Sequence, residues 1–208
     1  MHKVNAINSA VLLRARQFMG LDNRVQYLGL VPNNIRSTPP SVHYWTKPPH
    51  GTLKLNIDRA FVSNGRAGGG VIFRDHDGFV TKAFMNSYAT TSALHAELLS
   101  LLDGLRLCIR LGWNEVIIET DCSGVVKCVS DGRGAWRLIH LIDHIRSLMQ
   151  ECRASIHLIP REINSAADSL AKDGVSASIF TTLDPHELPS SVSGIVELER
   201  SSLPYIRF

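Results

Sequence analysis

The chain has 208 residues, of which 44% are hydrophobic and 20% are charged. This composition is typical of a soluble globular protein and excludes an intrinsically disordered chain. No apolar run is long enough to cross a bilayer, so we expect no membrane partner. The net charge of +3 is mildly basic and suits a polyanionic partner such as a nucleic acid. A chain of this length buries one good-sized core, and we expect one domain and a monomer.

Residues 1–50 are predicted to be an N-terminal extension that ends in a Pro-rich linker. The run STPPSVHYWTKPPHG contains closely spaced prolines, which exclude regular helix and favour an extended backbone. The first acidic residue is Asp22, and the basic and apolar run VLLRARQFM precedes it. A mitochondrial targeting peptide is therefore an alternative, but the low Arg and Ser content favours a nuclear or cytoplasmic location.

Residues 51–178 are predicted to form the folded domain, which begins with three antiparallel strands. In the run LKLNID, apolar residues alternate with polar ones, as in a strand with one buried face, and Asp58 lies on the polar side. The runs GGVIFR and FVTKAFM continue the sheet, and Asp77 and Gly78 between them are typical of a tight turn.

A helix is predicted to begin after Ser92 and to stop at Gly112, because leucines recur between them at steps of three and four residues. Glu97 lies among these leucines and therefore projects from the core-facing side. The run EVIIETD is the next predicted strand, with Glu119 and Asp121 on one face. A helical crossover leads to it, so it should run parallel to an earlier strand.

The remaining pattern predicts a short helix from about Ser123, a longer amphipathic helix, the strand SIHLIP and a final helix. Ser165 and Asp168 have the spacing of a capping box at the start of that helix. Residues 179–208 contain Pro and Ser and are predicted to be a loosely ordered tail. The whole chain predicts an α/β fold: a five-stranded mixed sheet, with three antiparallel strands followed by parallel strands, and helices on both faces.

The cysteines lack the close C-x-x-C pairing of zinc or redox sites, which indicates buried thiols in a reducing, intracellular compartment. They are Cys108, Cys122, Cys128 and Cys152. His140 and His144 are one helical turn apart, a spacing that can bind zinc. The charged residues beside them indicate a solvent-facing polar side instead.

Four acidic residues, Asp58, Glu97, Asp121 and Asp168, lie within predicted strands and helices or at their ends. Taken singly, each is more simply interpreted as a solvated or capping residue, and Asp168 suits the first turn of a helix. Several buried carboxylates together are costly unless something neutralises them, and a divalent cation is a suitable shared partner. Their order on strand, helix, strand and helix therefore predicts a metal site.

With these acids in this order, the chain resembles the ribonuclease H family of type 1, and in particular its plant reverse-transcriptase-like branch, which derives from retroelements. The motifs that carry the resemblance lie between about residues 45 and 175. They are WTKPPHGTLKLNID, GGGVIFRDHDG, HAE, ETD and PREINSAADSLAK.

The resemblance implies a ribonuclease H-like fold and hydrolysis of the RNA strand of an RNA–DNA hybrid. The family's catalytic site holds two Mg²⁺ ions, which Mn²⁺ can replace. By family position, Asp58 would bridge both ions, Glu97 and Asp121 would complete one side, and Asp168 would hold the ion nearer the nucleophile. Arg161 and Ser123 would contact the nucleic acid.

Departures from the family pattern leave an alternative function open, and two of them concern arginines. Arg59 follows Asp58 where the family usually has a small residue, and it could pair with a ligand carboxylate or a substrate phosphate. Arg161 lies roughly where the bacterial enzymes carry a mobile His, and Arg cannot shuttle protons near neutral pH. The alternative is a catalytically weak or inactive, retroelement-derived nucleic-acid-binding domain. A related exonuclease would carry Asp-x-Glu on the first strand, and Ala60 argues against it.

Overall fold

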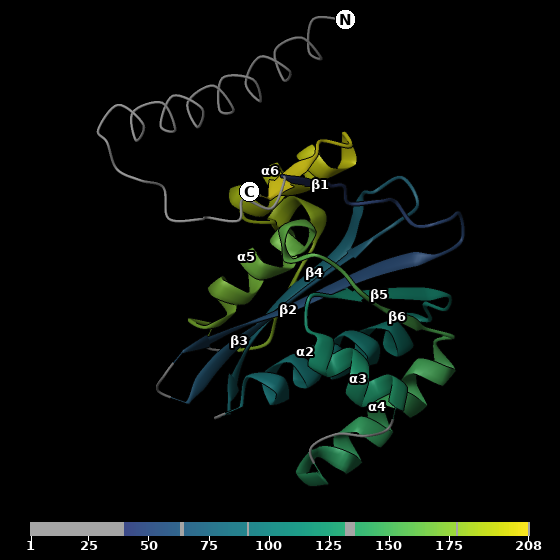
Figure 1. Ribbon diagram of the computed structural model, residues 1–208, viewed down its shortest axis with the longest axis vertical. Helices are drawn as coiled ribbons and strands as arrows, with labels where there is room; N and C mark the ends of the chain where they lie inside the picture. The colour runs from purple at the N-terminus through teal and green to yellow at the C-terminus, as the bar shows by residue number, and fades with distance from the viewer. Residues whose placement is uncertain (1–39, 63–64, 91, 132–135, 178, 208) are drawn as a thin grey trace, which may run out of the picture. The chain divides into compact units, whose positions relative to one another are not determined.

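The structure is a computed structural model that describes residues 40–62, 65–90, 92–131, 136–177 and 179–207 (Figure 1). These residues belong to one unit, Pro40–Arg207. The targeting peptide and most of the predicted N-terminal extension fall in residues 1–39, which lie outside the described residues. No helix in the described ranges is long and apolar enough to span a membrane.

The elements follow one another in an order that alternates strands and helices after an initial antiparallel meander. They are β1 (Ser41–His43), β2 (Leu53–Val62), β3 (Arg66–Arg74), β4 (Val80–Ala89), α2 (Ala93–Leu111), β5 (Val116–Thr120), α3 (Ser123–Asp131), the 3-10 helix η1 (Trp136–Leu138), α4 (Ile139–Glu151), β6 (Ser155–Leu158), η2 (Arg161–Asn164), α5 (Ser165–Gly174), β7 (Thr181–Leu183), η3 (Pro185–Glu187), α6 (Ser190–Arg200) and β8 (Tyr205–Arg207).

The main sheet has the strand order β6-β5-β2-β3-β4-β7. β2, β3 and β4 form the predicted antiparallel meander, and β5 and β6 are parallel to β2, also as predicted. The sheet has six strands rather than the expected five. The sixth strand, β7, pairs with the free edge of β4 and buries Leu183. Its three residues are too few to show an alternating pattern in the sequence.

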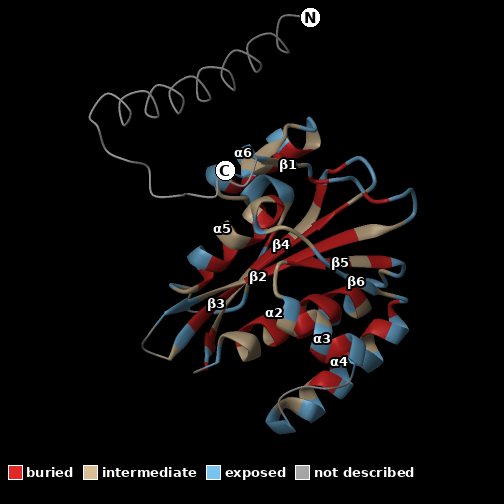
Figure 2. Ribbon diagram, viewed as in Figure 1, coloured by how far each residue is buried: buried red, intermediate tan, exposed pale blue. Residues whose placement is uncertain are grey.

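Helices cover both faces of this sheet, as expected for the α/β fold (Figure 2). On one face, the apolar residues of β2, β3 and β5 pack against α2, α3 and α4 in the larger core. On the other face, β3, β4 and β7 pack against α5 and α6 in a smaller core. The alternation of the strands therefore divides their side chains between two hydrophobic cores, and the buried residues concentrate along the central strands.

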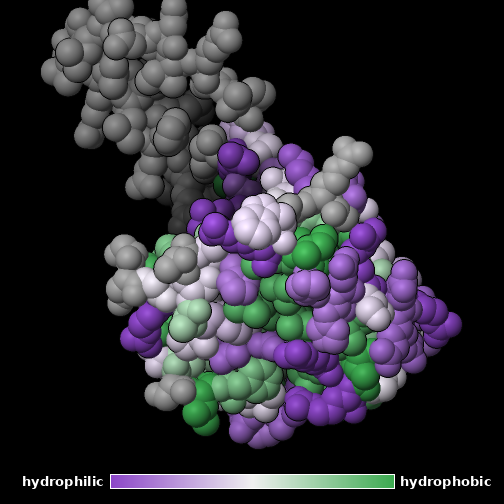
Figure 3. All heavy atoms as spheres, turned by 90° about the horizontal axis from the view of Figure 1, so that it is seen from below, coloured by the Kyte–Doolittle hydropathy of each residue, from purple (hydrophilic) through white to green (hydrophobic). Residues whose placement is uncertain are grey.

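The outer side of α4 is polar, as its sequence predicts. His140 and His144 are both exposed, and neither belongs to a cluster of potential metal ligands within the described residues. Figure 3, viewed from below with respect to Figure 1, shows hydrophilic residues interspersed with hydrophobic ones on the face that it presents.

The described part of the segment 179–208, which we expected to be loosely ordered, contains β7, η3, α6 and β8. Val192 and Val196 are one helical turn apart in α6 and are buried in the smaller core. β8 pairs with β1 in a separate two-stranded antiparallel sheet. The Pro and Ser residues of this segment lie mainly at the ends of short elements, and the composition alone does not reveal these elements.

Two of the three predicted helix-end features are present. Ser92 caps α2 by accepting a hydrogen bond from the His95 backbone N–H, and Gly112 ends α2 in the left-handed conformation. The capping box of Ser165 and Asp168 is absent, because η2 continues directly into α5. The Ser165 hydroxyl instead donates to the Glu162 carbonyl at 2.6 Å.

Three consecutive glycines in β3 allow helices to approach the sheet closely on both faces. A Cβ at Gly70 would lie 2.2 Å from the Ala171 backbone nitrogen in α5, and one at Gly68 would lie 2.0 Å from the Ala171 carbonyl oxygen. On the opposite face, a Cβ at Gly69 would lie 2.3 Å from the Ser100 hydroxyl of α2. The contacts of Gly68 and Gly70 involve backbone atoms of α5, which cannot move aside as a flexible side chain can.

We therefore expect Gly70→Ala to lower the free energy of unfolding by about 1–3 kcal/mol or more, because the added methyl group must push α5 away from the sheet. Gly194→Ala is the matched control. It lies in α6 with nothing within 4 Å of the added Cβ, so the better helix propensity should leave stability unchanged or raise it by up to about 1 kcal/mol. Urea unfolding of both variants measures the difference, and equal stabilities would contradict the close-approach explanation.

Candidate metal centre

The four predicted acids come from strand β2, from the position directly after its neighbour β5, and from two helices. Asp58 lies in β2 and pairs with Gly70 across to β3. β2 and β5 are parallel neighbours, with Asn56 opposite Glu119. Asp58 and Asp121 each come two residues after this pair, so they lie next to each other at the carboxyl end of β5. Glu97 lies in the second turn of α2, and Asp168 lies in the first turn of α5.

The structure brings three of these acids together. Asp58, Glu97 and Asp121 each offer a carboxylate oxygen, and these three oxygens lie within 4.8 Å of one another. Glu97 is 1% exposed and Asp58 is 6% exposed, whereas Asp121 is half-buried. Within the described ranges, this is the one cluster of three or more acidic, His or Cys residues close enough to share an ion.

Asp168 lies outside this cluster. Its carboxylate pairs with Lys172 one turn further along α5, and its Oδ1 lies 3.8 Å from Nη2 of Arg161. Its charge nevertheless contributes to raising the pKa values of Asp58 and Asp121. The Arg161 side chain is 76% exposed, and Ser123 is exposed at the start of α3.

Two neighbours hold the Glu97 carboxylate in place. The Thr120 hydroxyl donates to Glu97 Oε1 at 2.8 Å, and Arg59 Nε lies 3.6 Å from Glu97 Oε2. The sequence identified Arg59 as a cation that could pair with a ligand carboxylate, and the structure pairs it with Glu97. We did not anticipate the role of Thr120. Its position directly before Asp121, on the α2 face of β5, is a signal that could have indicated it.

Burial changes the ionisation of the three clustered acids. Burial, followed by the negative charge of Asp121, raises the pKa of Asp58 to about 7. Burial, followed by the charge of Asp58, raises the pKa of Glu97 to about 8. Burial also raises the pKa of Asp121, although the positive charges of Arg161 and Arg59 oppose this shift. The cluster therefore retains protons near neutral pH unless a cation replaces them.

The donor set fits a hard divalent cation such as Mg²⁺ or Mn²⁺. All three groups are carboxylates, which these ions prefer, and neither the His nor the thiol ligands typical of zinc are present in the cluster. Asp58 Oδ1 accepts a hydrogen bond from the Arg59 backbone N–H at 2.8 Å, which orients this carboxylate. Asp58, Glu97 and Asp121 are therefore the residues that could hold an ion, and Asp168 lies nearby.

Comparison with solved structures shows that the fold is shared with ribonucleases H. RNase H1 from Halobacterium salinarum NRC-1 is 22% identical, with a TM-score of 0.55 over 60% of this chain and 97% of that chain. The N-terminal RNase H domain of a Mycobacterium tuberculosis protein, solved as a fusion with maltose-binding protein, is 25% identical, with a TM-score of 0.55 over 60% and 93%. LC11-RNase H1, solved in complex with an RNA/DNA hybrid, is 22% identical, with a TM-score of 0.55 over 59% and 96%.

A search of curated proteins finds no match to this sequence. A family model, described as reverse transcriptase-like, matches residues 56–174. This range is more than half of the chain, and it contains all four predicted acids. The chain therefore belongs to the reverse transcriptase-like family, and its domain has the ribonuclease H fold.

Proposed function

We propose that the protein is a metal-dependent endonuclease that hydrolyses the RNA strand of RNA–DNA hybrids with two Mg²⁺ ions. The observation that carries this proposal is the convergence of Asp58, Glu97 and Asp121 within 4.8 Å in a ribonuclease H fold. When bound, the two ions supply Lewis-acid chemistry: they polarise the scissile phosphate, lower the pKa of the attacking water and stabilise the leaving oxygen.

The residues of the chain would divide the work of holding the ions. Asp58, Glu97 and Asp121 would hold the ions, with Asp58 contributing to both, and Asp168 would help to hold the ion that activates the attacking water. Thr120 would keep Glu97 Oε1 engaged, which leaves Oε2, the oxygen that Arg59 approaches, as the atom that would bind a cation. To bind the ion, Asp168 would have to break its ion pair with Lys172. The Lys172 side chain is largely exposed, so water can solvate its charge when the pair breaks.

Exposed polar residues beside the acids support nucleic-acid binding. The largely exposed Arg161 would contact a phosphate, and its charge next to Asp168 suits a backbone that passes over the site. Ser123, two residues after Asp121, would contact the same strand. Phosphate contacts do not distinguish RNA from DNA, so selection of RNA would depend on the 2′-hydroxyl and the shape of the hybrid.

The Arg59–Glu97 pair favours a second candidate function. If Arg59 permanently neutralises Glu97, the protein would bind nucleic acid as a retroelement-derived domain with weak or no turnover. One measurement distinguishes the two functions: a nuclease cleaves an RNA–DNA hybrid in the presence of metal, and a binding domain cleaves it weakly or not at all.

Asp58→Asn should reduce cleavage of a labelled RNA–DNA hybrid in Mg²⁺ or Mn²⁺ by at least about 100-fold, because the neutral amide cannot compensate the charge of the ions. Gel analysis of the cleaved RNA measures this effect. Asp77→Asn, at a largely exposed turn residue, is the control and should cleave like the wild type. Wild-type cleavage no faster than that of Asp58→Asn would end the nuclease proposal and favour the binding domain.

In the absence of metal, the protein should become less stable as the pH rises from about 4 to about 8. The pKa values of Asp58 and Glu97 are raised from their ordinary values of 3.8 and 4.5 to about 7 and about 8. The folded state therefore binds more protons than the unfolded state in this range, and the free energy of unfolding falls as these protons are lost.

Mg²⁺ or Mn²⁺ should oppose this loss, because an ion that binds only the folded state stabilises it by mass action. Thermal unfolding with EDTA or with millimolar ion, at pH 5 and at pH 8, tests both effects. The ion should raise the melting temperature more at pH 8. Thermal unfolding curves that are the same with EDTA and with the ion, at both pH values, would contradict a formed metal centre.

Arg59→Ala should increase Mn²⁺ affinity about fivefold, the effect of removing a partly exposed ion pair worth roughly 1 kcal/mol. The guanidinium competes with the cation for Glu97, and its removal frees that carboxylate. Arg106→Ala, which removes the same charge from an exposed position on α2, is the matched control. Isothermal titration calorimetry gives both affinities. A lower affinity for Arg59→Ala than for the control would mean that Arg59 supports the site instead of competing for it.

A further inference from the structure

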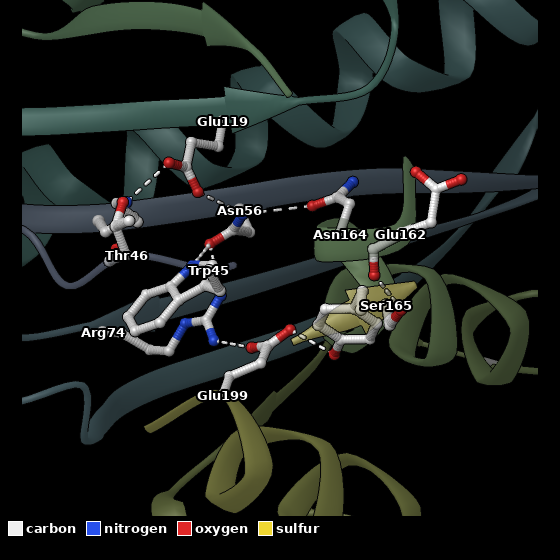
Figure 4. Close-up of polar contacts among 11 residues, drawn as sticks. Trp45, Thr46, Asn56, Arg74, Glu119, Glu162, Asn164, Ser165 and Glu199 are labelled. Atoms are coloured by element: carbon white, nitrogen blue, oxygen red, sulfur yellow. Dashed lines mark hydrogen bonds and ion pairs between the residues drawn. The ribbon is translucent and has the colours of Figure 1, made fainter. Parts of the chain in front are cut away.

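A buried polar network lies next to the metal centre and is centred on Asn56 (Figure 4). Asn56 is fully buried in β2, two positions before Asp58. Two other members stand in the same relation to other acids. Glu119 lies in β5 two positions before Asp121, and Asn164 lies at the end of η2, directly before the helix that carries Asp168. Three of the four acids thus share a continuous segment with a network residue.

The Asn56 side chain makes four hydrogen bonds. Its Nδ2 donates to Glu119 Oε2 at 2.9 Å and to Asn164 Oδ1 at 3.3 Å. Its Oδ1 accepts from Arg74 Nη2 at 2.7 Å and from Trp45 Nε1 at 3.3 Å. These bonds use the full capacity of a primary amide. The amide nitrogen donates toward the segments that carry Asp121 and Asp168, and the amide oxygen accepts from the Arg74 guanidinium. An aspartate or an apolar side chain at this position cannot reproduce them.

Asn164 extends the network to the backbone beside the metal centre. Its Nδ2 donates to the Ile57 carbonyl at 2.8 Å, and Ile57 directly precedes Asp58. The segment that leads into α5 is therefore joined to β2 both through the Asn56 side chain and through the main chain next to Asp58. These contacts fix the spacing between the two segments.

The charges within the network are balanced. Lys54 Nζ lies 2.7 Å from Glu119 Oε1, and Arg74 forms a buried ion pair with Glu199. The Arg74 guanidinium also lies 3.7 Å from the centre of the Trp45 ring, over its face. The four charged side chains are at most 9% exposed. Breaking a buried pair of this kind is costly, because one charge is left without a partner.

The outer end of the network comes from the C-terminal segment. Glu199 lies in the last turn of α6, and the Tyr205 hydroxyl of β8 donates to its Oε1 at 2.8 Å. Both residues lie beyond the matched range 56–174. A chain of contacts therefore runs from α6 through Arg74 to Asn56 and on to the segments that carry the acids.

On the basis of the proposed function, we propose that Asn56 is a positioning residue of the metal centre, and that α6 holds Asn56 in place through Glu199 and Arg74. The carboxylates must lose their protons to bind an ion and then repel one another, so their segments must be held together by other contacts. Residues that support metal ligands without touching the ion commonly change metal affinity 10- to 100-fold when they are replaced.

Asn56→Ala should lower Mn²⁺ affinity at least about 10-fold, because it removes the links among β2, β5 and the segment before α5 without changing the charge. Asn86→Ala is the matched control. It removes an amide that donates to the Asp103 carboxylate at 3.1 Å, on β4 and α2, and it should bind Mn²⁺ like the wild type. Calorimetric titration of the full-length, EDTA-treated proteins measures the affinities, at a temperature where circular dichroism shows each variant to be folded.

A second pair of variants tests the contribution of α6 and is also available if Asn56→Ala fails to fold. Glu199→Gln should lower Mn²⁺ affinity in the same direction but less strongly, because it weakens the hold on Arg74. Glu197→Gln makes the same charge change at an exposed position of α6, where Glu197 pairs with Arg200, and should leave the affinity unchanged.

The outcomes separate this inference from the proposed function. A purely structural role would lower the melting temperatures of Asn56→Ala and Glu199→Gln but leave the Mn²⁺ affinities of the folded proteins at the wild-type value. That result would overturn the positioning role. Wild-type protein that binds Mn²⁺ but cleaves no hybrid would overturn the nuclease alone, and weaker binding by Asn56→Ala would then still support the positioning role.

Discussion

The burial of several carboxylates in one place is the constraint on which the candidate site depends. Asp58 and Glu97 are almost completely shielded from water, and Asp121 adds a third negative charge within reach of both. An isolated cluster of this kind would be strongly unfavourable in ionised form. The chain reduces the cost by retaining protons, by placing Arg59 against Glu97, and by donating a hydrogen bond from Thr120. Each of these compensations is one that a divalent cation can replace.

The three consecutive glycines of β3 allow the helices that carry two of the acids to lie close to the sheet. Glu97 and Asp168 lie on helices that cover opposite faces of the sheet, and their distances from Asp58 in β2 depend on how closely α2 and α5 approach the neighbouring strand β3. Gly69 receives α2 on one face, and Gly68 and Gly70 receive the backbone of α5 on the other. Larger residues at these positions would move the helices outward and separate the acids that they carry. The glycine run therefore serves the site although it contributes no functional group to it.

The sequence predicted the features that depend on local periodicity and failed where distant residues decide. The alternation in LKLNID, the leucine spacing around Glu97 and the helical crossover before Asp121 are local signals, and they correctly located the elements that bring three acids together. The pairing of Asp168 with Lys172, four residues along the same helix, is a local feature that the sequence allows beside a role as a metal ligand. The pairing of Arg74 with Glu199 joins residues 125 positions apart, and no local pattern indicates it. For the same reason α6 and β7, whose packing depends on surfaces formed by earlier elements, could not be recognised from their own residues.

The pairing of β1 with β8 has a consequence for the architecture of the chain. The strands at the two ends of the described unit are antiparallel partners, with Ser41 opposite Arg207. The entry and exit points of the unit are therefore adjacent, a geometry that tolerates insertion of a domain into a longer polypeptide or a rearrangement of its chain order. A host protein could gain or lose this unit at one surface loop, because the two ends of that loop would remain close together.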